Sequence, residues 1–198
     1  MANTVASTLS FSYNAGGDLL SASDADSSNT FLYTPRGLLK SDFQQLTSTI
    51  TATINNKSYD ALGRRTQFQV KLGNVVDSTV DYGYSPDGIE TTIKQSGTKV
   101  ANKSVKYTRD AAGRLSQLKR YADLNNTEPV AWTDFVSDSV NGVTLDRTKS
   151  ITHRFETTIL DQFNLTWDAA NRLKSVDATN DGTSTFQYDL INQLVVAD

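Results

Sequence analysis

A seven-residue pattern that recurs along the chain constrains the fold more than any other feature of the sequence. The pattern opens on an aromatic residue, continues with a small polar residue, carries Gly or Asn in its fifth slot and usually ends on an aliphatic residue. Internal repeats decide the architecture of a chain before local propensities do, so they are interpreted first. Seven copies are found, and they open at Tyr13, Tyr33, Tyr59, Tyr84, Arg109, Trp167 and Tyr188.

The fifth slot predicts one backbone conformation. Gly adopts a positive φ without steric cost, and Asn is among the few other residues that tolerate it. A slot restricted to these two residues predicts a tight hairpin turn, in which a type I turn is followed by a left-handed residue. The second slot agrees, because Asn, Asp and Ser fold a side-chain oxygen back onto the following amides and Thr34 does so more weakly. The fifth-slot residues are Gly17, Gly37, Gly63, Gly88, Gly113, Asn171 and Asn192.

The residues that flank the turns have the period of β-strands. Two positions before each opening residue, six of the seven copies carry an apolar side chain, and Lys57 is the exception. Residues i and i+2 of a strand share one face. Returning strands are predicted at 67–72, 115–121 and 173–177, and a further hairpin turn at 180–182. We therefore predict an all-β fold over a single domain, residues 1–198, in which an array of antiparallel β-hairpins forms a curved or spiralling sheet.

Some stretches depart from the pattern. Residues 46–54 alternate as a half-buried strand, whereas residues 35–46 come nearest to helical spacing and predict a short helical turn. Arg109 occupies an aromatic slot, and Tyr107 is expected to provide the packed apolar side chain of that copy instead. Arg64 and Arg65 stand where most copies place an aliphatic residue, and they are interpreted either as charges on an array edge that discourage edge pairing or, equally, as a point where the sheet opens.

Composition excludes several classes of function. The net charge is −3 and the pI is about 5.1. With basic residues scattered along the chain, no nucleic-acid groove is indicated. The chain has no Cys, so disulfides and thiolate chemistry are absent. No apolar run is long enough to span a membrane, and no signal peptide is visible at the start. The length of 198 residues predicts one domain with a sizeable core.

Catalytic and metal-binding patterns are weak. His153 is the single histidine, and it lies in a strand pattern without a nucleophile elbow elsewhere. The runs 24–28 and 177–182 resemble the start of calcium loops, but a solvated loop and a hairpin turn explain them better. We expect no enzyme activity, no metal and no cofactor. Trp132 lies outside every copy and is a possible ligand contact, for example with a glycan; core packing is the competing interpretation.

The copies resemble a known family. Residues 59–64 (Tyr-Asp-Ala-Leu-Gly-Arg), 110–115 (Asp-Ala-Ala-Gly-Arg-Leu) and 167–173 (Trp-Asp-Ala-Ala-Asn-Arg-Leu) look like YD repeats, also called RHS repeats. The openings are spaced by 20, 26, 25, 25, 58 and 21 residues, close to the spacing in that family. The long interval has room for one more degenerate copy near residue 138. The resemblance covers nearly the whole chain.

The resemblance implies a structural role. In that family an antiparallel β ribbon spirals into a hollow bacterial shell, which encloses a toxin domain or forms a stalk or adhesion module. The implied partners are the rest of the parent chain, other copies through β edges, a toxin domain or a cell-surface glycan, and the implied location is extracellular or at the cell surface. The family's self-cleavage motif, Asp-Pro-x-Gly-Leu, is absent, because Pro35, Pro86 and Pro129 follow Thr, Ser and Glu. The repeats reach both ends, so a segment of a longer array is expected. The alternative is a self-associating or adhesive module that works through open β edges.

Overall fold

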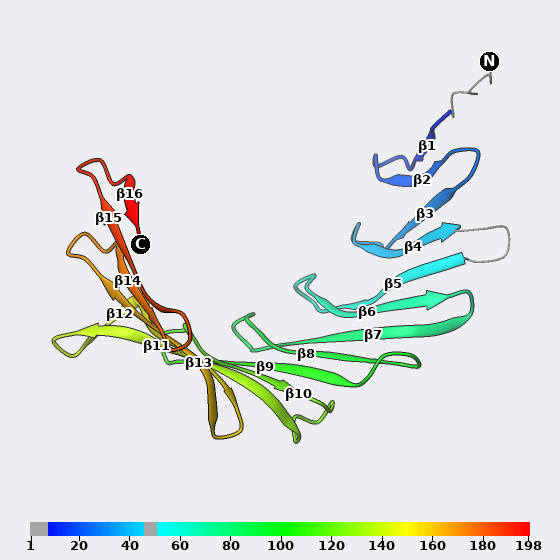
Figure 1. Ribbon diagram of the computed structural model, residues 1–198. Helices are drawn as coiled ribbons and strands as arrows, with labels where there is room; N and C mark the ends of the chain where they lie inside the picture. The colour runs from blue at the N-terminus through cyan, green and yellow to red at the C-terminus, as the bar shows by residue number, and fades with distance from the viewer. Residues whose placement is uncertain (1–7, 46–50) are drawn as a thin grey trace, which may run out of the picture. The chain divides into compact units, whose positions relative to one another are not determined.

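The protein is all-β. The computed structural model describes the backbone of residues 8–45 and 51–198, and the side chains of 8–45 and 58–198. It contains sixteen strands, and no helix is found in the described residues (Figure 1). The predicted fold class, an array of antiparallel hairpins, is confirmed. The chain divides into two compact units, residues 1–103 and 104–198, which are called the N-terminal and C-terminal units.

In the N-terminal unit, eight strands pair in the order of the sequence. Each strand is antiparallel to the next, from the pair β1–β2 to the pair β7–β8. The strands are β1 (Ser10–Tyr13), β2 (Leu19–Ser23), β3 (Ser28–Tyr33), β4 (Leu39–Gln45), β5 (Thr51–Tyr59), β6 (Arg65–Leu72), β7 (Val75–Tyr84) and β8 (Glu90–Gly97).

The C-terminal unit is built in the same way. Antiparallel pairing again follows the sequence, from β9–β10 to β15–β16. Its strands are β9 (Lys103–Arg109), β10 (Leu115–Tyr121), β11 (Pro129–Val140), β12 (Val143–Phe155), β13 (Thr158–Trp167), β14 (Leu173–Ala178), β15 (Gly182–Tyr188) and β16 (Leu194–Ala197).

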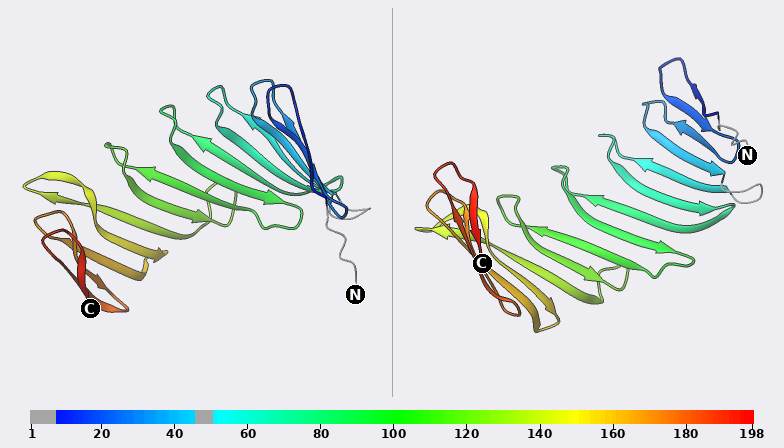
Figure 2. Two further views of the ribbon diagram at one scale, coloured as in Figure 1. Left: turned by 90° about the horizontal axis from the view of Figure 1, so that it is seen from above. Right: turned by 45° about the horizontal axis from the view of Figure 1, so that its top comes forward.

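Within each unit the strands form one layer. Among the described elements, each strand packs only against its neighbours in sequence. Figures 1 and 2 agree that β4 to β8 lie side by side with no second layer over them. The sizeable core expected from the chain length is therefore not found: no large side chain in the described part is fully buried, and the buried apolar residues there are Tyr121 and Ala178. A single layer leaves both faces in contact with solvent, which explains why Phe11 and Leu62 are 52% and 73% exposed.

The predicted strands agree with the structure in most places. The returning strands are β6, β10 and β14, and β10 has the predicted bounds. The predicted helical turn at 35–46 is wrong, because Leu39 and Phe43 belong to β4. Of the strand predicted at 46–54, residues 51–54 lie in β5, and 46–50 lie outside the described residues.

The stretch expected to hold a degenerate copy near residue 138 forms a different turn. Val140 pairs with Val143, so the hairpin between β11 and β12 closes with two residues, Asn141 and Gly142. Both have positive φ, 51° and 76°, which is the requirement of a type I′ turn. The seven-residue pattern is not needed to reverse the chain here.

Candidate functional site

The seven pattern copies fold into seven turns of the same kind. In each, the second-slot amide donates to the sixth-slot carbonyl, and the fifth-slot amide donates to the second-slot carbonyl. In the third copy these bonds are Asp60 N to Arg64 O and Gly63 N to Asp60 O, both 3.0 Å. Backbone φ is positive at all seven fifth-slot residues, as their restriction to Gly and Asn predicts: Gly17 88°, Gly37 73°, Gly63 82°, Gly88 92°, Gly113 81°, Asn171 65° and Asn192 66°. These turns are the candidate functional site, because their side chains also contact the neighbouring hairpin.

The second-slot side chain closes each turn from inside. In five copies its Oδ1 atom accepts hydrogen bonds from the amides of the fourth and sixth slots, at 2.8 to 3.0 Å. Asp168 accepts both bonds at 2.9 Å. Thr34 and Ser85 have one hydroxyl each and accept a single bond from the sixth slot, at 3.1 and 3.2 Å. The side-chain capping expected for Asx and Ser/Thr turns is therefore present.

An arginine in the sixth slot pairs with an aspartate in the second slot. The ion pairs are Arg64–Asp60 at 2.5 Å, Arg114–Asp110 at 2.6 Å and Arg172–Asp168 at 2.7 Å. Sequence reasoning missed this role and placed Arg64 on an array edge. The signal was present, however, because Arg stands four residues after three of the four second-slot aspartates.

Hydrogen bonds of the turn shift the titration of these carboxyl groups. The amide of Arg172 holds the pKa of Asp168 below its usual range, and the guanidinium of the same residue adds to the effect against the opposing effect of desolvation. For Asp110 the hydrogen bond from the Arg114 side chain is the largest cause of the lowered pKa. Each carboxylate is therefore held in its charged form by its own turn.

A pH-dependent loss of stability follows for Asp168→Asn. A carboxyl group whose pKa is lowered in the folded state stabilises the fold above its unfolded pKa, and this contribution is lost as the pH falls through the folded pKa. The variant keeps the Oδ1 acceptor and loses the charge. We expect its melting temperature to be lower than that of the parent protein at pH 7, and the difference to vanish at about pH 2.

The matched control for this experiment is Asp181→Asn. Asp181 is exposed in the same unit, and within the described part of the chain it has no ion pair. Its melting temperature should follow that of the parent protein at both pH values. A deficit of Asp168→Asn that persists unchanged at the acidic pH would contradict a role for the charge.

The opening aromatic residue links its hairpin to the one before it. In five of the six copies that open on an aromatic residue, a ring hydroxyl or indole N–H donates to a backbone carbonyl, which in four of the five bonds belongs to the seventh slot of the previous copy. The bonds are Tyr33 Oη to Leu19 O, 2.9 Å; Tyr59 Oη to Leu39 O, 2.5 Å; Tyr84 Oη to Arg65 O, 2.8 Å; Tyr188 Oη to Leu173 O, 3.0 Å; and Trp167 Nε1 to Thr148 O, 2.9 Å. The aromatic slot thus serves as a hydrogen-bond donor as well as an apolar surface.

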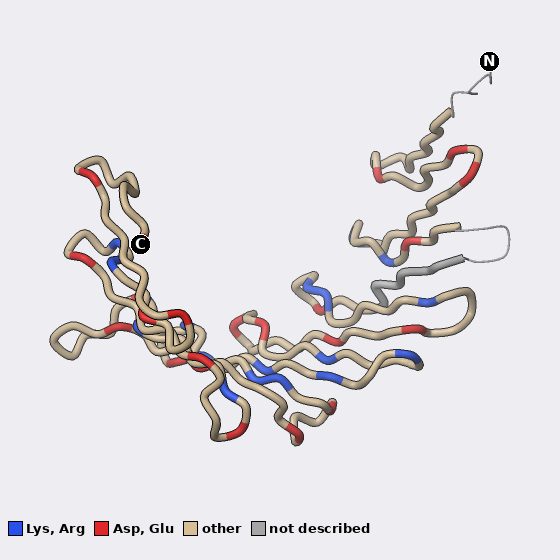
Figure 3. Tube along the Cα trace, in the orientation of Figure 1, with Lys and Arg blue, Asp and Glu red and all other residues tan. Residues whose placement is uncertain are grey.

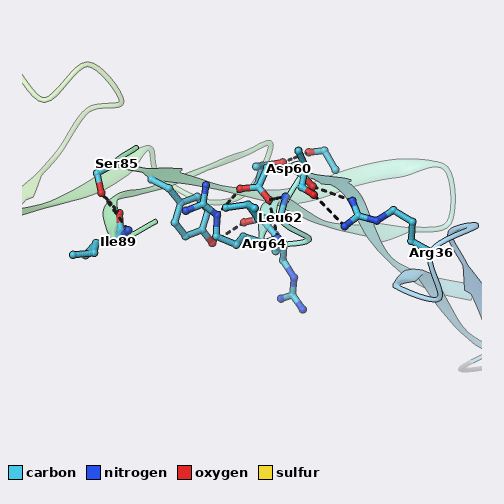
Figure 4. Close-up of polar contacts among 11 residues, drawn as sticks. Arg36, Asp60, Leu62, Arg64, Ser85 and Ile89 are labelled. Atoms are coloured by element: carbon cyan, nitrogen blue, oxygen red, sulfur yellow. Dashed lines mark hydrogen bonds and ion pairs between the residues drawn. The ribbon is translucent and has the colours of Figure 1, made fainter. Parts of the chain in front are cut away.

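Guanidinium groups add a second link between neighbouring turns. Arg64 lies over the ring of Tyr84 with 4.4 Å between its Cζ atom and the ring centroid, and Arg172 lies over Tyr188 at 4.7 Å. Arg36 reaches the carbonyls of Asp60 and Ala61 in the next turn, as Figure 4 shows for its approach to the turn that contains Asp60 and Arg64. Cation–π contacts at exposed sites contribute about 0.5–1 kcal/mol each.

The fifth copy departs from the others. Arg109, in the aromatic slot, donates from Nη1 to the carbonyl of Gly113 in its own turn, 3.1 Å away. Tyr107, which was expected to provide the packed apolar side chain of this copy, is half-buried in β9. Arg114 of this copy donates to the carbonyl of Leu145, 3.0 Å away, so the link toward the following hairpin is retained by the arginine.

Trp132 and His153 lie on β11 and β12, away from the turns. Trp132 is half-buried, and the Lys119 ammonium lies 5.5 Å from its ring centroid, so one face of the ring already has a partner. His153 shares a hydrogen bond of 2.9 Å with the Thr133 hydroxyl and meets the Phe163 ring edge-on, 5.9 Å away. These contacts give both side chains packing roles within the sheet.

The described residues contain no group of three or more His, Cys, Asp or Glu side chains placed to hold a metal ion. In the first calcium-like run, residues 24–28, the Asp24 carboxylate accepts hydrogen bonds from the amides of Asp26 and Ser27 and caps its own loop.

No helix long and apolar enough to cross a membrane occurs in the part of the chain that the structure describes. Acidic residues lie at several of the hairpin turns (Figure 3).

Comparisons with known proteins identify the fold. No protein-family model matches the chain, and no curated protein matches it. Among solved structures, a chain in the crystal structure of TcdB2-TccC3-Cdc42 matches over 96% of this chain with a TM-score of 0.64 and 17% sequence identity. The fold is RHS-like. The match covers 10% of the length of that chain, and at this identity it establishes the fold alone.

Proposed function

We propose that this chain is a wall segment of a bacterial RHS-type β-shell or surface stalk and that it has no catalytic role. The observation that carries the proposal is the single layer of hairpins within each unit, in which side chains of most turns bond a neighbouring hairpin. Tyrosine hydroxyls and arginine guanidinium groups of one hairpin bond the backbone of another, so the hairpins within each unit are held together without a core. Such an arrangement suits a wall with two solvent-facing sides.

The same residues support a structural rather than an enzymatic role. Asp60, Asp110 and Asp168 are committed to turn caps and ion pairs, and His153 to packing. The likeness to a chain of a structure named for TcdB2, TccC3 and Cdc42 supports a toxin-associated shell. The proposed partners are therefore a toxin domain and the rest of a parent chain, and the proposed location is extracellular.

The mass and shape of the native protein test this function. An antibody raised against the 21.7 kDa chain should detect a band far above that mass in the producing organism, and electron cryomicroscopy of the captured particle should show a closed β-shell with a hollow interior. A band near 21.7 kDa, or a large particle without a hollow, would overturn the shell.

A second candidate, self-association through β edges, is favoured by the exposed ends of the array. All four residues of β1 are exposed, with Tyr13 at 60%. Leu194 and Val195 of β16 are 53% and 58% exposed. An open strand edge is a template for another chain. Light scattering of the purified chain tests this candidate: a filament subunit forms open-ended assemblies, and a chain that stays monomeric would overturn it.

A further inference from the structure

An open cavity lies between the first two pattern turns of the N-terminal unit. Its volume is about 470 Å³, and its lining includes Asn14, Asp18, Tyr33, Thr34 and Gly37. In terms of the pattern, these are the second and sixth slots of the first copy and the first, second and fifth slots of the next. The cavity therefore lies at a defined position of the repeat, between one turn and the following aromatic ring.

In the third copy the same slots surround a guanidinium group. Arg64, in the sixth slot, pairs with the second-slot Asp60 at 2.5 Å and lies 4.4 Å from the ring centroid of Tyr84, the first slot of the next copy. A Cβ atom at Gly88, the fifth slot of that next copy, would lie 2.9 Å from Arg64 Nη1. The arginine thus fills the space that is a cavity between the first two turns.

The sixth copy repeats this arrangement in the C-terminal unit. Arg172 pairs with Asp168 at 2.7 Å and lies 4.7 Å from the ring centroid of Tyr188. Its Nη1 atom donates to Oδ1 of Asn192, the fifth slot of the next copy, at 2.8 Å. Two independent junctions therefore use the same surroundings for a guanidinium group.

The first copy carries the opposite charge in the sixth slot. Asp18 stands where Arg64 and Arg172 stand in their copies. It is half-buried, and its Oδ2 atom accepts a hydrogen bond of 2.8 Å from Asn14 Nδ2. This junction therefore presents a carboxylate and the Tyr33 ring, and its turn contributes no arginine to fill the space between them.

We propose that this cavity binds the guanidinium group of an arginine side chain presented by another polypeptide. A planar guanidinium stacks on an aromatic face and forms paired hydrogen bonds with a carboxylate, and the cavity offers both groups. An ammonium group fits less well because it is a strongly hydrated point charge, and Asp18 repels anions. The site extends beyond the wall function and does not depend on it.

An NMR titration of the isotope-labelled chain with N-acetyl-arginine amide tests the proposal. We expect shifts of the Asp18, Thr34 and Gly37 amides, no shifts with the neutral isostere N-acetyl-citrulline amide, and weaker shifts with N-acetyl-lysine amide. Equal shifts with the citrulline compound would overturn recognition of the cation, and equal shifts with the lysine compound would overturn recognition of the guanidinium. No shift at concentrations up to the solubility of the arginine compound would overturn the site.

Two variants and a control sharpen the test. Asp18→Asn keeps the size of the side chain and its bond to Asn14 and should weaken arginine binding about tenfold, because a charge-assisted bond is replaced by a neutral one. Asp18→Arg restores the sixth-slot arginine of other copies and should abolish binding, while the spectrum shows that the fold is intact. Asp26→Asn changes an exposed carboxylate in the β2–β3 loop, at the other end of these strands from the cavity, and should bind like the parent protein. Unchanged binding by Asp18→Asn would refute the site.

Discussion

Replacing Gly97 by Ala lowers the free energy of unfolding of the N-terminal unit by about 3 kcal/mol, at the upper end of the usual range for overpacking. Gly97 is the last residue of β8 and pairs with Ser78 of β7. A Cβ atom at this position would lie 2.1 Å from the carbonyl oxygen of Asp77 and 2.9 Å from the Cα atom of Ser78. Backbone atoms cannot rotate away as a side chain can, so the two strands must separate.

The effect of Gly97→Ala is measured by urea unfolding and by hydrogen–deuterium exchange. Exchange of the β7 and β8 amides should be faster in the variant. Gly16→Ala is the matched control in the same unit, because its Cβ atom would meet nothing closer than Asn14 Oδ1 at 3.3 Å; we expect a change within about 0.5 kcal/mol. Equal stabilities of the two variants would contradict the close approach of β7 and β8.

Replacing Trp167 by Ala lowers the free energy of unfolding of the C-terminal unit by about 3 kcal/mol, the lower limit for Trp in a core, since this side chain is half-buried. The substitution removes the indole surface, the bond from Nε1 to Thr148 O of 2.9 Å and the contact with the Arg147 guanidinium, 5.7 Å from the ring. Three contacts between neighbouring hairpins are lost at once.

Trp167→Phe separates the ring from its N–H group. It keeps an aromatic face and loses the hydrogen bond, so we expect a loss of about 1 kcal/mol. Both tryptophans of the chain lie in the C-terminal unit, and in either variant the fluorescence of Trp132 alone reports the unfolding of that unit. If Phe and Ala prove equally destabilising, the ring contributes nothing and the proposed link reduces to its hydrogen bond.

The sequence predicts the strands and turns of this fold because their rules are local. Asn192 and Gly113 share a slot since both adopt positive φ, and the alternation at 115–121 places β10 within its observed bounds. The single layer is not predictable in this way. Alternation shows that a strand has two faces, but not whether a second sheet covers one of them.

Contacts between repeats were also beyond sequence reasoning. The bond from Tyr59 to Leu39 depends on the lateral spacing of strands twenty residues apart, which no local rule contains. Gly97 resembles any turn glycine in sequence, and its close approach to Asp77 appears only in three dimensions. Leu38, Leu39 and Phe43 matched a helical spacing, yet the shift of register between Leu32 and Tyr33 fits Leu39 into a strand pair.

Pairing between sequence neighbours alone has a consequence for how the chain acquires its structure. Within each unit every strand docks on the strand made just before it, so the entropy of loop closure at each step is that of one short turn. Contacts between residues that are close in sequence form quickly. A growing or emerging chain can therefore add one finished hairpin at a time, with each completed edge serving as the template for the next, and it need not wait for its last residue.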